Sequence, residues 1–268
     1  MKLTRQLLFV IAAACVAAVV VFVTISRGAE REPDACVTRD FEGSRFIVCT
    51  YDTARDELRL ASRDADGNYL RNFEALAAHL GADTSRVRFA MNAGMYNDAS
   101  APIGLYINEG EQERGLSRTD GPGNFHMKPN GVFWQDENGA VYVTATDAYA
   151  AEPRAARFAT QSGPMLVIDG ALHQQFQHDG PSRYLRNGVG VRDEHTAFFV
   201  ISSGVVSFGR FARFFRDELN CDNALFLDGS VSSLWSPQLD RRDESADLGR
   251  CPATLGVHDM NWQRLLFE

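Results

Sequence analysis

Lysine is almost missing from this chain of 268 residues, and the chain carries few basic residues relative to acidic ones. Lys2 and Lys128 are the only lysines, so arginine carries nearly all of the positive charge. The 27 basic residues are outnumbered by 35 acidic ones, which gives a net charge of −8. Because a protein needs a basic face to bind a phosphate backbone, nucleic acid is excluded as the main partner. Clustered arginines would instead suit a small anion, which a guanidinium can grip through two hydrogen bonds.

Several catalytic and metal-binding motifs are also missing. The sequence has no CxxC or HxxxH pair, so a structural zinc site lacks a ligand set of the usual spacing. It has no GxSxG motif, which argues against a serine hydrolase. The six histidines match no metal-ligand template, and no cofactor is expected. A divalent cation bound by Asp228 and backbone oxygens stays open, because such sites leave little trace in a sequence.

One long apolar run lies near the N-terminus, at residues 7–23. Basic residues precede it, which keeps that end in the cytoplasm and delivers the remainder across the membrane. We expect residues 1–27 to be a signal peptide or a membrane anchor and residues 28–35 to be a linker. The rest of the chain would lie on the periplasmic face of the inner membrane if the segment is uncleaved, and would otherwise be periplasmic or secreted.

Cysteine is scarce but even in number once Cys15, inside the apolar run, is set aside. Four cysteines in an exported chain predict disulfides, and three connectivities are open. We favour Cys36–Cys49, which flank a strand-like segment, and Cys221–Cys251, which bracket the most polar loop of the C-terminal half.

Short strands dominate the body of the chain, and two helices lie between them. Asn72 and Ser207 are each followed by apolar residues at helical spacing, and this predicts capped helices that begin at 73 and 208. Strand patterns cover 45–51, 57–61, 86–91, 103–108, 132–135, 140–144, 165–169, 171–173, 189–192, 196–202 and 224–227. Strands and helices do not alternate regularly, so we predict an α+β fold with a mixed, largely antiparallel sheet and a few packed helices. Residues 36–268 are predicted to form a single domain.

Five polar loops that contain glycine accompany these strands. They are residues 92–97, 128–133, 161–165, 186–192 and 227–233. Glycine lets a backbone turn sharply and approach a ligand, and asparagine and aspartate add fixed polar groups. Each loop alone is typical of a plain turn, but five of them at strand ends in one small domain indicate a binding site.

The loops carry a resemblance to a known family. Their strings are NAGMY (92–96), GNFHMKPNGVF (123–133), QSGPM (161–165), RNGVGV (186–191) and LDGSVSS (227–233). In this order they resemble the phosphodiester glycosidases, whose best-known branch uncovers mannose 6-phosphate on lysosomal proteins, and they are most similar to an exported bacterial branch. The resemblance covers Cys36 to the C-terminus. It implies hydrolysis of a sugar-1-phosphodiester on a glycan, with release of the sugar.

One loop departs from that family. The uncovering branch has an LDGGGS string, whereas this chain places Val231 where the family has glycine. Valine does not readily adopt the dihedral angles that are open to glycine, so the shape of this loop and the substrate that it accepts should differ.

Three residues are candidates for catalysis. Asp228 ends an apolar strand and would serve the anomeric carbon or a water molecule, because glycosyl transfer needs a carboxylate. Arg186 suits a phosphate, and Asn92 suits a sugar hydroxyl or the water. We expect these three to converge on one cleft. The substrate-binding candidates are Gly94, Asn130, Ser162, Gly163, Asn187, Gly229 and Ser230, and no second carboxylate stands out among Asp98, Glu109 and Asp169.

Two other kinds of protein stay open. One is a carbohydrate-binding or polysaccharide-export accessory protein on the same scaffold, without turnover, because scaffold alone does not decide function. The other is an unrelated hydrolase.

Overall fold

The structure, a computed structural model, describes residues 33–97, 101–152, 154–228, 232–243 and, as a strand, 253–258. Residues 35–268 form one compact unit, separate from residues 1–34. Within the described ranges, no helix is long and apolar enough to cross a bilayer. The predicted signal peptide or anchor lies outside those ranges, so it stays a prediction.

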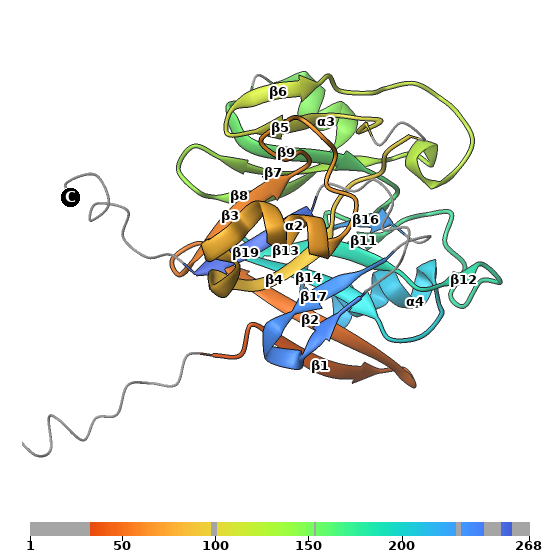
Figure 1. Cartoon of the computed structure of the whole chain (residues 1–268). Helices are drawn as coiled ribbons and strands as arrows, with labels where there is room; N and C mark the ends of the chain where they lie inside the picture. The colour runs from red at the N-terminus through yellow and green to blue at the C-terminus, as the bar shows by residue number, and fades with distance from the viewer. Residues whose placement is uncertain (1–32, 98–100, 153, 229–231, 244–252, 259–268) are drawn as a thin grey trace, which may run out of the picture. The chain divides into compact units, whose positions relative to one another are not determined.

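Antiparallel pairing joins the described strands into four sheets (Figure 1). The first runs β1 (Cys36–Phe41), β2 (Ser44–Asp52), β14 (Thr196–Ser202), β13 (Asn187–Asp193), β16 (Asn223–Asp228), β10 (Met165–Ile168), β11 (Ala171–Leu172). The second sheet has the order β18 (Arg241–Arg242), β17 (Leu234–Ser236), β4 (Val87–Asn92), β19 (Ala253–His258), β3 (Asp56–Ala61). The third sheet has the order β6 (Glu111–Arg114), β5 (Tyr106–Asn108), β9 (Ala156–Ser162), β7 (Gly131–Asp136), β8 (Val141–Ala145). The fourth is a ribbon of β12 (Arg183–Tyr184) and β15 (Val206–Ser207). The predicted α+β class is confirmed, and every pairing between the described strands is antiparallel.

Both predicted helices are present with the predicted caps. In α2 (Phe73–Leu80) the side chain of Asn72 accepts a hydrogen bond from the backbone of Ala75 at 2.7 Å. In α4 (Phe208–Arg213) the hydroxyl of Ser207 accepts from the backbone of Arg210, and a π-helical turn continues the helix over Phe214–Glu218. A third helix, α3 (Thr146–Ala151), was not predicted because it is too short to show an apolar period.

The first sheet has a hydrophobic core cluster on each of its two faces. Leu225 and Leu227 of β16 point into one cluster, between the sheets, whereas Phe226 between them points into the other, beneath α4. This is the alternation that a pleated strand imposes. The cluster beneath α4 is rich in stacked rings, such as Phe46 against Phe214 with centroids 4.1 Å apart. The same alternation decides where the candidate site residues point.

Of the two predicted disulfides, Cys36–Cys49 is present, and it joins directly opposed residues of β1 and β2. The prediction of Cys221–Cys251 is wrong in this structure, because Cys221 is a free thiol. Its side chain is buried in the cluster beneath α4, and its sulfur donates to the carbonyl of Leu219. Cys251 lies outside the described residues.

Candidate functional site

One buried amide joins three strand ends. The Nδ2 of Asn187, at the start of β13, donates to the backbone oxygen and the Oδ1 of Asn92 at 2.9 and 2.8 Å. The Oδ1 of Asn187 accepts from the backbone N–H of Asp228 at 2.8 Å. Asn92 ends β4 and Asp228 ends β16, so these hydrogen bonds hold the ends of strands from two different sheets together. Two of the three catalytic candidates are therefore brought together, through a residue that sequence reasoning placed only in substrate binding.

The loop after Asp228 is fastened to the same network. The backbone N–H of Ser233 donates to the Oδ1 of Asn92 at 2.9 Å, and the hydroxyl of Ser232 donates to the backbone oxygen of Asp228 at 2.8 Å. Gly229 and Ser230, predicted to bind substrate, lie outside the described residues. Ser233 was missed as a site residue, although it belongs to the LDGSVSS string. The Nδ2 of Asn92 is buried and has no hydrogen-bond acceptor among the described residues, so it has hydrogens to offer a ligand.

The other substrate-binding candidates pack the loops against one another. The hydroxyl of Ser162 donates to the backbone of Leu227 at 2.9 Å, and the Nδ2 of Asn130 donates to the backbone of Phe125 at 3.0 Å. A Cβ on Gly94 would meet the backbone oxygen of Gln161 at 2.5 Å, and one on Gly163 would meet the Cβ of Asn130 at 2.6 Å. These glycines are needed because the loops approach so closely.

Gln161 holds a further loop in place and was missed by the sequence reasoning. Its Oε1 accepts from the backbones of Leu105 and Ser117, both at 2.9 Å. Its Nε2 donates to the backbone of Ser117 at 2.7 Å and to the hydroxyl of Thr146 at 3.1 Å. The only signal in the sequence was its place at the head of the QSGPM string. Each polar atom of this buried side chain is thus used to fasten chain segments.

Arg186 lies on the opposite face of the first sheet from the side chain of Asn187. Its Nε donates to the backbone of Val206 at 3.0 Å, and an Nη donates to the backbone of Ser182, also at 3.0 Å. Its guanidinium carbon lies 3.5 Å from the centre of the Phe208 ring, beneath α4. The prediction that its side chain shares one cleft with Asn92 and Asp228 stays a prediction. Arg186 directly precedes β13, and Asn92 and Asp228 are the last residues of β4 and β16.

No carboxylate of the described residues forms an ion pair with Arg186. This arginine is fully buried, and among the same residues its Nη1 also lacks a hydrogen-bond acceptor. Burial lowers the pKa of Arg186 to about 10, so the guanidinium is still charged at neutral pH. A buried charge without a counter-ion is costly, and such groups are concentrated at functional sites.

No second carboxylate joins this network in the described part of the chain. Glu109 forms an exposed pair with Arg157, with 2.9 Å between Oε2 and Nε. Asp169 lies exposed at the turn between β10 and β11, and Asp98 lies outside the described residues. Within the same ranges, no group of three or more histidine, cysteine, aspartate or glutamate side chains could hold a metal ion.

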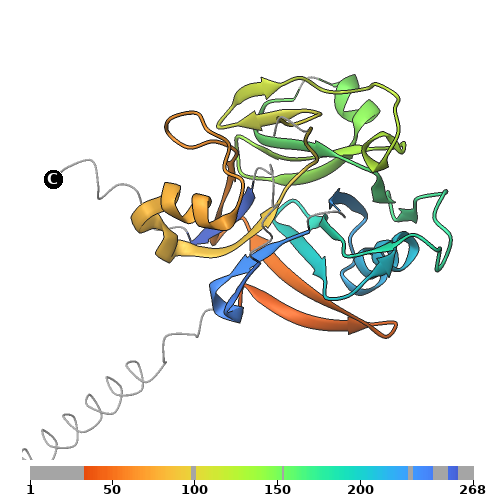
Figure 2. The same cartoon turned by 45° about the vertical axis from the view of Figure 1, so that its right-hand side comes forward.

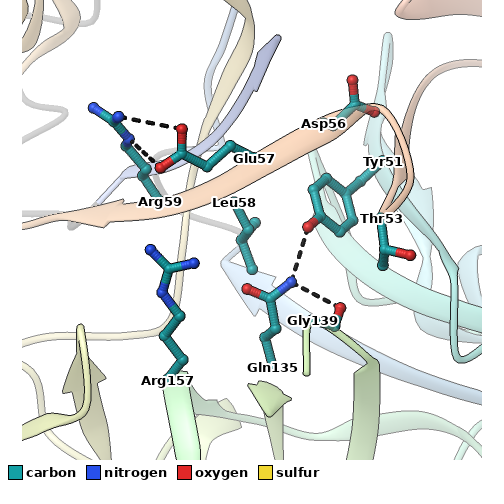
Figure 3. Close-up of a pocket in the computed structure, with 9 residues that line it drawn as sticks. All are labelled: Tyr51, Thr53, Asp56, Glu57, Leu58, Arg59, Gln135, Gly139 and Arg157. Carbon is teal, nitrogen blue, oxygen red and sulfur yellow. Dashed lines mark hydrogen bonds and ion pairs between the residues drawn. The ribbon is translucent and has the colours of Figure 1, made fainter. Parts of the chain in front are cut away.

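A cavity of about 410 Å³ lies at the other ends of the strands (Figure 3). Gln135 lines it at the end of β7 opposite to the site loops, and Arg157 lines it at the start of β9. Some of its polar side chains are engaged with one another: Glu57 with Arg59, and Gln135 with the Tyr51 hydroxyl at 2.8 Å. Burial raises the pKa of Tyr51 to about 12. This cavity is separate from the network around Asp228.

A second cavity, of about 250 Å³, adjoins Arg186. Phe176, Phe208 and Ser182 line it, and the last two also contact the Arg186 guanidinium. Asn124 and Met127, from the GNFHM string, form another wall. The loops singled out in the sequence therefore surround both faces of the end of β13.

Comparison with known proteins agrees with this arrangement. The sequence profile of the phosphodiester glycosidase family matches residues 85–257, which include all five loops. The uncharacterised protein YigE of Escherichia coli K12 is 32% identical over 186 residues, or 69% of this chain and 72% of YigE. The catalytic domain of zebrafish N-acetylglucosamine-1-phosphodiester alpha-N-acetylglucosaminidase, auto-inhibited by pro-peptide, shares the fold with a TM-score of 0.54 at 15% identity, covering 87% of this chain and 86% of that one. The chain described here belongs to the phosphodiester glycosidase family.

Proposed function

We propose that this chain is an exported hydrolase that cleaves a sugar-1-phosphodiester between the anomeric carbon and the phosphate, on an envelope or extracellular glycan. The observation that carries the proposal is the network in which Asn187 fixes Asp228 beside Asn92. The network fixes the backbone of Asp228 at a strand end, and a carboxylate is the kind of group that glycosyl transfer to water uses as base or nucleophile. The spare amide donor of Asn92 belongs to the same network. Membership of the phosphodiester glycosidases supports the reaction class.

Asp228 is the residue that we assign to the reacting carbon. The oxygen of water bonds to the anomeric carbon, and the bond from that carbon to the phosphate oxygen breaks, leaving its electron pair on the phosphate. The proton that water loses passes to the Asp228 carboxylate. The products are the free sugar and a phosphomonoester. Because phosphate is a good leaving group, the step does not depend on a strong general acid.

Arg186 and Asn92 are the residues that we assign to binding. The unbalanced charge of Arg186 favours a dianionic or monoanionic phosphate, to which its Nη1 can donate. The spare Nδ2 of Asn92 can donate to a sugar hydroxyl or to the attacking water. Since Arg186 and Asn187 flank the end of β13 on opposite faces, we place the phosphate at that end, where it is within reach of both faces. A divalent cation at Asp228 is part of what the test below examines.

We also propose that residues 1–27 hold the chain in, or lead it across, the inner membrane, with the domain on the periplasmic side. The basis is the apolar run at residues 7–23 and the basic residues that precede it. Digestion of intact and opened cells with a protease tests this location. If the protease cleaves the domain only after the inner membrane is broken, the domain lies in the cytoplasm instead.

The reaction is tested by incubating the full chain with nucleotide-diphosphate sugars and with alkyl sugar-1-phosphodiesters, with and without EDTA. We expect release of free sugar, and we expect Asp228→Asn to reduce it by roughly a hundredfold or more. Asp169→Asn, at an exposed turn, is the matched control. Binding of the sugar phosphodiester without release of sugar would instead support a non-catalytic carbohydrate-binding protein, and a full rate in Asp228→Asn would remove this residue from the mechanism.

A further inference from the structure

Three apolar side chains stand out on the surface of the domain. Tyr184, Leu185 and Val205 are 57%, 44% and 59% exposed, and among the described residues no other large apolar side chain is as exposed as these. Tyr184 pairs with Val206 across the β12–β15 ribbon, so all three belong to one projection of the chain. Figures 1 and 2 show the segment around β12 extending away from the sheets. We call these three residues the rim patch.

The rim patch is continuous with the candidate site. The hydroxyl of Ser232, in the loop after Asp228, donates to the backbone of Leu185 at 3.4 Å. The ring centre of Tyr184 lies 5.6 Å from the guanidinium carbon of Arg186. A group attached to a phosphate near Arg186 therefore has the exposed apolar side chains of the rim patch close by, in addition to Phe208 and the cavity that it lines.

The size and composition of the rim patch fit a lipid better than a protein. Three side chains cover far less than the area that a stable protein interface buries, which is roughly 800 Å² on each partner. A tyrosine beside aliphatic residues is typical of surfaces that lie at the boundary between headgroups and acyl chains. Two exposed arginines flank the patch: Arg183 directly precedes Tyr184, and Arg45 lines the same surface hollow as Val205. Their partners, Asp40 and Asp179, are also on the surface, where such pairs hold an arginine only weakly.

We propose that the rim patch binds the hydrocarbon chain of a lipid-linked aglycone, so that the substrate is a sugar joined through a phosphodiester to a membrane lipid. This rests on the proposed function. Water adds to the anomeric carbon, the carbon–oxygen bond to phosphate breaks, and the lipid keeps its phosphate as a monoester in the bilayer. The sugar leaves on the aqueous side, and the proton passes to Asp228 and then to solvent. The rim patch takes no part in the bond changes and sets the specificity for the aglycone.

The test compares two phosphodiesters of the same sugar, one ethyl and one hexadecyl, with the full chain reconstituted in vesicles of phosphatidylcholine and phosphatidylglycerol. For the native chain we expect kcat/KM to be higher on the hexadecyl ester. The double variant Leu185→Ser and Val205→Ser should lower the ratio of kcat/KM, hexadecyl over ethyl, by about tenfold, since it removes apolar contact with the chain alone. Leu185→Met with Val205→Leu keeps the rim patch apolar and should keep the ratio.

The outcomes separate the two proposals. Hydrolysis of both esters with the same ratio in the native and serine variants overturns the lipid inference and leaves the proposed function standing. Loss of the ratio in the apolar variant as well would also overturn it, because packing rather than apolar contact would then be responsible. Hydrolysis of neither ester by the native chain overturns both proposals.

Discussion

Asn187 shows how a single side chain can hold the parts of a site together. It donates to Asn92 and accepts from Asp228, and its side chain is fully buried. The sequence places this residue in the RNGVGV string but does not reveal that its amide spans two sheets. Its position is decided by the register of β13 against β16, in which Asn187 lies opposite Asp228 beside a bulge. A one-residue bulge cannot be deduced from a strand pattern.

Removal of that amide should weaken both stability and activity. Asn187→Ala leaves the backbone N–H of Asp228 and the Oδ1 and backbone oxygen of Asn92 to find other partners in a buried place. We expect the free energy of unfolding to fall by about 3 kcal/mol, measured by urea denaturation. Asn187→Asp keeps an acceptor for Asp228 but turns a buried carboxylate oxygen toward the two oxygens of Asn92, so it should lose at least as much stability. Equal stability in the alanine variant and the native chain would contradict this role.

Substitution of Arg186 by lysine should weaken substrate binding. An ammonium cannot donate in the same plane to Val206 and Ser182 while it lies flat against Phe208. We expect KM for a sugar-1-phosphodiester to rise about tenfold or more. Arg183→Lys, an exposed change three residues earlier, is the control. An unchanged KM in Arg186→Lys would mean that the guanidinium only fastens the chain around it.

At the scale of elements, the helices and most strands could be predicted, and their reasons are local. Caps and apolar spacing mark α2 and α4, and runs of aromatic and β-branched residues mark β2 and β14. β9 has no comparable run, because Phe158 is its only aromatic residue and Thr160 its only β-branched one. Similarly, the short strand β17 owes its form to pairing with the distant strand β4, and β18 in turn pairs with β17. Such pairing is decided by the assembled sheets rather than by the segment itself.

The glycines of the RNGVGV string belong to packing between elements. A Cβ on Gly190 would lie 2.5 Å from a ring carbon of Phe215 and 2.8 Å from the sulfur of Cys221. We expect Gly190→Ala to push the helical segment away from β13 and to lower the free energy of unfolding by about 1 to 3 kcal/mol. Gly204→Ala meets no atom within 4 Å and serves as the control. Thermal or urea denaturation of both variants measures the difference. Equal free energies of unfolding would show that the helical segment moves away from β13 without loss of stability.

The hairpin of β1 and β2 depends on its disulfide. The bond between Cys36 and Cys49 spans 13 residues of sequence. Closing a loop of this size stabilises the folded chain by about 3 kcal/mol in the chain-entropy model. The double variant Cys36→Ser with Cys49→Ser should lose roughly that amount, and reduction of the native chain should have the same effect. A reductant that leaves the free energy of unfolding unchanged would argue against the bond.

At the scale of the whole molecule, five loops that are far apart in the sequence meet at the strand ends, as their shared composition predicted. The face on which each side chain lies could not be predicted, because it depends on pleat and register across sheets. Arg186 and Asn187 are neighbours in the chain and point to opposite faces for this reason. A second consequence of the assembled fold is a set of buried ionisable groups that no local pattern indicates.

His173 makes the stability of the whole molecule sensitive to pH. Burial lowers the pKa of its imidazole, whose Nε2 lies 3.1 Å from the backbone oxygen of Lys128. The unfolded chain therefore binds this proton more tightly than the folded one. The stability is fully present above the ordinary histidine pKa of about 6.5 and declines as the pH falls below it.

His173→Gln should flatten the dependence of the free energy of unfolding on pH just below 6.5. The carboxyls of Glu42 and Asp179, whose pKa values are lowered by hydrogen bonds to Arg213 and Arg183, should dominate only at lower pH. His79→Gln, on the exposed side of α2, is the control for loss of a histidine. Urea denaturation between about pH 5 and pH 8 measures the slope, and an unchanged slope in His173→Gln would exclude this residue as its source.

The disulfide also decides how the domain would bear a mechanical load. β1 is the edge strand of the first sheet, and Cys36 is its first residue, so a pull from the N-terminal side reaches this point before any other part of the sheet. When an edge strand is pulled from one end, its hydrogen bonds to the neighbouring strand break one after another. The bond to Cys49 passes the force directly into β2, which is paired on both sides, by β1 and by β14. The first sheet would therefore resist being peeled apart by a pull on its N-terminal side.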